Sequence, residues 1–138
     1  MSAWGPGLYE NDAARDWAER LRDDANGLDF IEQTLREVNM SAYVEAYVGE
    51  RGLVAADVVA RIRRDGDGGD LSTYAEHVIE WLKANPKADA DLLVLSAQDA
   101  IVRVTGEDSE LVEIWSGRGE ADLHLWLDTV TELDQRLG

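Results

Sequence analysis

Residues 11–23 read Asn11-Asp12-Ala13-Ala14-Arg15-Asp16-Trp17-Ala18-Glu19-Arg20-Leu21-Arg22-Asp23 and set the pattern for the whole chain. Four apolar residues recur at positions i, i+3, i+4 and i+7, the spacing of one helix face; they are Ala14, Trp17, Ala18 and Leu21. Asn11 stands where an N-cap belongs, and Asp12 falls in the positive first turn. The stretch predicts an amphipathic helix that Asn26-Gly27 ends, because both residues tolerate left-handed backbone.

The same helical period continues along the chain between cap and stop signals. It predicts further helices that begin near residues 29, 53, 73, 89, 109 and 120. Residues 41–50 are ambiguous, because Gly49 and Gly52 interrupt an otherwise helical spacing. No alternation of apolar and polar residues is long enough to predict a strand. The sequence therefore predicts an all-α fold, a compact single domain over 1–138 with about six to seven helices and an ordered loop over 1–10.

The chain is strongly acidic, with 29 acidic and 13 basic residues and a formal net charge of −16. Such a surface repels nucleic-acid phosphates and anionic lipid, so we expect neither nucleic acid nor membrane as a partner. It favours a basic protein partner, although net charge also serves solubility alone. The longest apolar run, Leu92-Leu93-Val94-Leu95, is far shorter than the ~20 residues of a membrane span. With no cysteine and no signal-peptide pattern at the N-terminus, the expected location is the cytoplasm.

The N-terminal segment from Ala3 to Trp17 resembles the opening of a known bacterial family, domain of unknown function 4259. The resemblance rests on a Trp-Gly-x-Gly motif at Trp4, an aromatic residue, a Glu-Asn-Asp run from Glu10 and an Asp-Trp pair at Asp16. Two weaker segments, 55–60 and 109–115, are also similar to the family. The resemblance implies a compact bacterial domain and assigns no activity.

The sequence contains no recognisable catalytic or metal-binding motif. It lacks a Gly-x-Ser-x-Gly elbow, a phosphate-binding glycine loop and a dinucleotide fingerprint. The loop Asp65-Gly-Asp67-Gly-Gly69-Asp70 resembles a calcium loop only in part, since Asp70 stands where glycine is required. His77 and His124 lie on different predicted helices without further ligands. We therefore expect no metal, no cofactor and, on balance, no enzyme.

Two groups of residues are the candidates for binding. The N-terminal signature offers Trp4, Asn11, Asp12 and Asp16 as the wall of a ligand pocket, although each has a sufficient structural role as a cap or as cover for the helical bundle. The first helix also carries one acidic stripe at i, i+4, i+7 and i+11, formed by Asp12, Asp16, Glu19 and Asp23.

These observations favour a non-catalytic interaction protein of an inhibitor or immunity type that binds a basic protein surface. The alternatives are a small-ligand binding module that uses the N-terminal signature, or a hydrolase with a carboxylate site. Among the five tryptophans, Trp17, Trp115 and Trp126 are expected in the core, whereas Trp4 and Trp81 are expected to be partly exposed.

Overall fold

The computed structural model describes residues 5–63 and 75–138. Within these ranges the chain forms helices and no strand, so the predicted all-α class is confirmed. The elements are α1 (Asp12–Asp23), α2 (Gly27–Met40), α3 (Ala46–Arg63), α4 (Glu76–Ala84), the short 3-10 helix η2 (Asp91–Leu93), α5 (Val94–Val104), α6 (Glu110–Gly117) and α7 (Glu120–Leu137).

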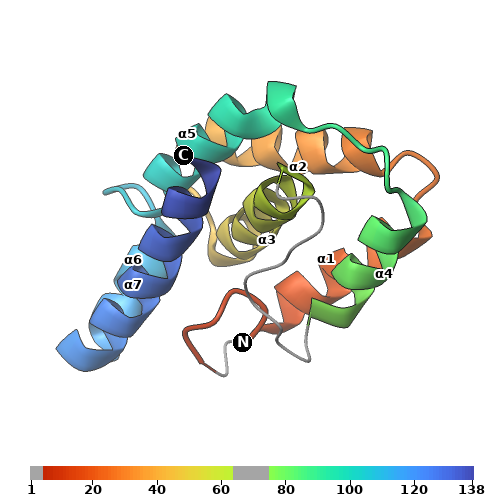
Figure 1. Ribbon diagram of the computed structural model, residues 1–138. Coiled ribbons are helices and arrows are strands. Elements are labelled where there is room, and N and C mark those ends of the chain that lie inside the picture. Colours follow the sequence, from red (N-terminus) through yellow and green to blue (C-terminus); the bar gives the residue numbers. More distant parts are fainter. Residues whose placement is uncertain (1–4, 64–74) are drawn as a thin grey trace.

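Helix α3 is the centre around which the others pack. Figure 1 shows α2 and α5 along one side of it, α1 and α4 along a second, and α6 and α7 along a third. Every residue from Gly52 to Arg61 is buried, because neighbours cover the helix on all sides. Apart from Asp57 and Arg61 this stretch is apolar on every side, and such a helix is stable only when it is buried.

The two glycines within α3 allow its neighbours to approach closely. A Cβ atom on Gly52 would lie 2.5 Å from Cγ2 of Val38 in α2, and one on Gly49 would lie 2.9 Å from Cδ1 of Leu111 in α6. Residues 46–50, which the sequence left ambiguous, therefore belong to one continuous helix. The glycines mark close helix packing here and not an interruption of the helix.

The connection between α1 and α2 differs from the prediction. Asp24, in extended backbone, ends α1, and Gly27 is the first residue of α2 and not a left-handed stop. Gly27 lies against Trp81 of α4, so that a Cβ atom there would meet the indole Nε1 at 2.5 Å. Trp81 is only 3% exposed, and the expectation of partial exposure was wrong because α2 covers its ring.

The start of α5 also corrects the sequence prediction. The Asp89 carboxylate accepts a hydrogen bond of 2.9 Å from the Asp91 backbone N–H, and the chain forms η2 before α5 begins at Val94. Leu92, expected in the core, is 97% exposed because it lies on this turn. The sequence also predicts Leu93, Ala97, Ala100, Ile101 and Val104 as core residues; Leu93 is half-buried, and the other four are buried.

An isolated parallel β-bridge between Val44 and Ser109 joins two loops that are far apart in the sequence. The Val44 N–H donates to the Asp108 carbonyl at 2.8 Å, and the Glu110 N–H donates to the Val44 carbonyl at 2.9 Å. The bridge anchors α6, whose Trp115 stacks on Trp126 of α7 with 6.3 Å between ring centroids. The last two helices are thereby fixed against α3.

Candidate functional site

The predicted acidic stripe lies on the outer side of α1. Asp12, Asp16, Glu19 and Asp23 are all exposed, while Ala14, Trp17, Ala18 and Leu21 are buried on the inner side. Asp23 forms a salt bridge of 3.1 Å with Nε of Arg22, a cation of the same helix. The stripe therefore presents negative charge that α1 itself neutralises only in part.

Helix α4 extends this negative surface. Nη1 of Arg22 lies 2.9 Å from Nδ1 of His77 in α4, and Nδ1 of His77 lies 3.6 Å from the Glu80 carboxylate. A hydrogen bond from Arg22 to Asp23 raises the pKa of Arg22, and the charges of Glu80 and Glu19 act in the same direction. We call the exposed carboxylates of α1 together with Glu80 the acidic face; its residues are Asp12, Asp16, Glu19, Asp23 and Glu80.

Asn11 is separate from the acidic face, because it is a buried cap. Its Oδ1 accepts a 2.7 Å hydrogen bond from the Ala14 N–H, and its Nδ2 donates to the Leu8 carbonyl at 3.3 Å. The side chain is 6% exposed. The predicted N-cap is therefore formed, and this amide contributes to the helix start.

The N-terminal signature folds back onto the molecule. The Glu10 carboxylate accepts a 2.8 Å hydrogen bond from the Gly7 N–H, and a Cβ atom on Gly5 or Gly7 would lie 2.7 Å from Oε1 of Glu10. The two glycines of the motif thus leave space for the Glu10 side chain. Trp4, the remaining candidate of the signature, lies outside the described residues.

Tyr9, in the middle of the signature, contacts a buried charge cluster that the sequence analysis did not single out. The Tyr9 hydroxyl donates to Oδ2 of Asp57 in α3 at 2.6 Å. The same carboxylate accepts from Nε of Arg61 at 2.7 Å and from Nη2 of Arg136 in α7 at 2.6 Å. Asp57 is fully buried, so the two guanidiniums provide the charge compensation that a buried carboxylate requires.

Arg136 connects the buried cluster to Glu132, an acid at the protein surface. Nε of Arg136 lies 3.1 Å from Glu132, a salt bridge of spacing i, i+4 along α7. Burial alone lowers the pKa of Arg136, but the carboxylates of Asp57 and Glu132 outweigh it and raise that pKa. The cluster holds α3, α7 and the N-terminal loop together, and all its groups have charged partners.

A second buried acid, Glu50, lies beside the signature loop. Burial raises its pKa to about 7, and the nearby carboxylates of Asp12 and Glu110 add to this effect. The space beside Glu50 has a volume of about 10 Å³, room for roughly one water molecule. It is lined by Gly5, Gly7, Leu8, Asn11, Glu50, Leu53, Leu111, Trp115 and Trp126.

The acidic and histidine side chains of the described residues form no metal-binding cluster. Over 5–63 and 75–138, no three of these side chains converge closely enough to hold an ion. His124 is exposed on α7, and His77 contacts Arg22. The calcium-like loop from Asp65 to Asp70 lies outside the described residues.

The chain belongs to a protein family defined by sequence. The family model described as domain of unknown function (DUF4259) matches residues 2–129, which is most of the chain. Comparison with curated proteins and with solved structures gave no match. Within the part of the chain that the structure describes, no helix combines the length and the apolar character needed to cross a bilayer.

Proposed function

We propose that this protein is a non-catalytic, cytoplasmic interaction protein that binds a basic protein surface through the acidic face, in the manner of a bacterial inhibitor or immunity protein. The observation that carries the proposal is the exposure of all four carboxylates along the outer side of α1. Glu80, an exposed acid of the neighbouring helix α4, adds a further negative charge beside those of α1. A basic partner would gain both orientation and association rate from such a face.

The two alternatives receive less support from the geometry of the described residues. The space bounded by the N-terminal signature holds about 10 Å³, far less than the several hundred Å³ of ordinary ligand sites. A hydrolase with a carboxylate site would need an acid inside a cleft that a substrate can enter. Asp57 already accepts three hydrogen bonds, and Glu50 faces a space of one water molecule.

The experiment compares two triple variants of equal charge change. The first replaces Asp16, Glu19 and Asp23 with Asn, Gln and Asn. The control replaces three exposed acids of α7 with asparagine; they are Asp122, Asp128 and Asp134. A partner captured from host lysate by the wild-type chain is purified, and its affinity for each variant is measured over a range of salt concentrations.

We expect the acidic-face variant to lose about tenfold or more in affinity, mainly through a slower association rate. The α7 control should stay within about twofold of wild type, because its charges lie on a different helix. Equal losses in both variants would mean that net charge alone attracts the partner. The same conclusion would follow if unrelated basic proteins such as cytochrome c bound the wild-type chain as tightly as the captured partner.

A further inference from the structure

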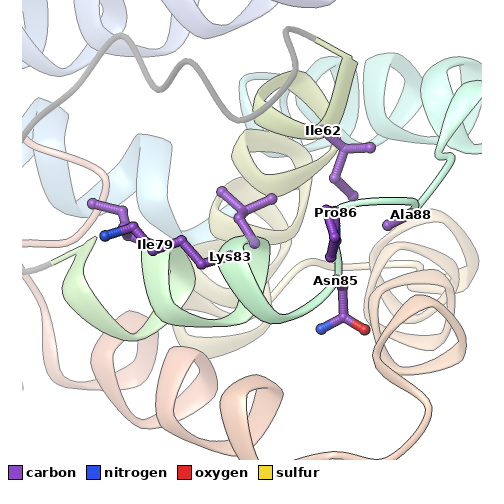
Figure 2. A pocket seen from close by; sticks show the side chains of 7 residues that line it. Ile62, Ile79, Lys83, Asn85, Pro86 and Ala88 are labelled. Carbon is purple, nitrogen blue, oxygen red and sulfur yellow. The ribbon is translucent and has the colours of Figure 1, made fainter.

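A hollow of about 310 Å³ lies where the end of α3 meets α4 and the turn before η2. Figure 2 shows its lining side chains, which come from all three segments. They are Ile62, Ile79, Leu82, Lys83, Asn85, Pro86 and Ala88. This volume falls within the range of small-molecule sites.

The turn that forms one wall of the hollow is held by hydrogen bonds. Nδ2 of Asn85 donates to the Trp81 carbonyl at 2.9 Å, and the Ala88 N–H donates to the Asn85 carbonyl at 3.1 Å. Pro86 fixes the backbone between them. The apolar wall is thereby preformed, and a ligand would not have to order it on binding.

The walls leave apolar surface partly uncovered. Ile62, Ile79, Leu82 and Ala88 are each only half-buried, although all four pack against the core. Partly exposed aliphatic side chains around a concave surface favour an apolar ligand group, because its binding removes their surface from water.

The cationic groups at the hollow provide a second, independent observation. The chain contains only two lysines, Lys83 and Lys87, in a sequence of net charge −16. Lys83 lines the hollow, Lys87 follows Pro86, and both side chains are exposed. Neither lysine forms a salt bridge with any residue of the described chain.

The acids nearest to these lysines in the sequence have partners elsewhere. Glu80 lies 3.6 Å from His77, and Asp91 lies 3.6 Å from Nε of Arg63. The Asp89 carboxylate accepts the hydrogen bond from the Asp91 N–H. The two ammonium groups are therefore available to an external anion, in contrast to most of this acidic surface.

We propose that the hollow binds a small amphipathic carboxylate, with its apolar part against Ile62, Ile79 and Leu82 and its carboxylate beside Lys83. The apolar walls supply most of the affinity, and the ammonium selects the negatively charged head group. The residues of this site differ from those of the acidic face, so its test can be distinguished from that of the proposed interaction with a basic protein.

The test uses octanoate and octanol as probes of equal chain length. Each is titrated into the full-length chain, and backbone amide shifts are followed by two-dimensional NMR. We expect octanoate to bind with a Kd of about 1 mM or lower and to shift amides around residues 82–88. Octanol should bind about five- to tenfold more weakly, because it lacks the charge that Lys83 recognises.

Three variants separate the contributions to binding. Lys83→Met keeps the alkyl stem and should reduce octanoate affinity to that of octanol, while octanol binding stays unchanged. Ala88→Leu fills the hollow and should weaken both probes about tenfold or more. Arg36→Met removes an exposed cation on α2 and should change neither affinity, which controls for the overall charge.

The amide spectrum of each variant also reports whether it is folded. The exposed position of Lys83 keeps the test valid if Ala88→Leu does not fold. Equal affinity of the wild-type chain for the two probes would overturn the proposal. Shifts confined to residues outside the hollow, or an unchanged octanoate affinity in Lys83→Met, would overturn it as well.

Discussion

Glu50 offers a direct test of how burial governs an ionisable group in this fold. Glu50 is 7% exposed, and the pKa of its carboxyl is raised from 4.5 to about 7. Replacement by glutamine keeps the shape of the side chain and removes its charge at every pH. We therefore expect Glu50→Gln to gain its full stability advantage over the wild type above pH 7, where Glu50 is ionised in the folded chain as well.

The sign of the pH dependence follows from the two pKa values of Glu50. Between pH 4.5 and about 7 the folded chain holds a proton on Glu50 that the unfolded chain has lost. The wild-type free energy of unfolding therefore falls as pH rises through this window. The gain in free energy of unfolding of Glu50→Gln over the wild type should be absent below pH 4.5. It should grow between pH 4.5 and about 7 and stay constant at higher pH.

The magnitude can be worked from the shift. At 1.36 kcal/mol per pKa unit, the full shift corresponds to about 3 kcal/mol. Glu50 keeps a small contact with solvent, since 7% of the residue is exposed, and this contact screens part of the charge. The free energy of unfolding is compared between Glu50→Gln and the wild type at each pH. We expect this difference to be about 1–2 kcal/mol more favourable to the variant at pH 8 than at pH 4.5.

The assay is urea unfolding at both pH values, followed by tryptophan fluorescence. Trp115 and Trp126 line the same space as Glu50 and report on its packing. Glu45→Gln, at an exposed acid just before α3, is the control for the loss of one surface charge. A difference between Glu50→Gln and wild type that is equal at pH 4.5 and pH 8 would refute the reasoning.

Four further substitutions, one of them a control, test the packing, each by urea unfolding at pH 7. Asp57→Asn leaves two buried guanidiniums without their carboxylate and should cost about 3–5 kcal/mol; a loss below about 1 kcal/mol would show that the cluster is hydrated. Gly52→Ala meets Val38 and should cost about 1–3 kcal/mol, whereas Gly117→Ala has open space and should be neutral or slightly stabilising. Trp17→Ala removes a ring that is 1% exposed and should cost about 3–5 kcal/mol, and a loss below about 1 kcal/mol would place the ring at the surface.

The sequence predicted the outer helices well, because each has one apolar side. In α1 all four residues of the stripe from Ala14 to Leu21 are buried, and α7 extends from Glu120 to Leu137 as expected. The central helix was harder to predict, since a helix covered on all sides has no stripe. Gly49 and Gly52 appeared as interruptions because their role depends on the distance to α2 and α6, which local spacing does not contain.

The candidate site was predictable to a similar extent. The exposure of the four acids on α1 follows from their spacing opposite Trp17. The buried cluster around Asp57 carried a local signal, because Asp57 and Arg61 lie at i, i+4 within an apolar run. Its third charge, Arg136, is 79 residues away in the sequence, and only the packing of α7 against α3 brings it there.

That distance has a consequence for synthesis of the chain on the ribosome. Helix α3 emerges early, but one guanidinium that compensates its buried Asp57 is encoded 79 residues later. Until Arg136 has left the ribosomal exit tunnel, closing the core around Asp57 leaves that carboxylate without one of its two cationic partners. Because burying incompletely compensated charge is costly, the nascent chain should remain open to chaperones and proteases until almost all of these helices are made.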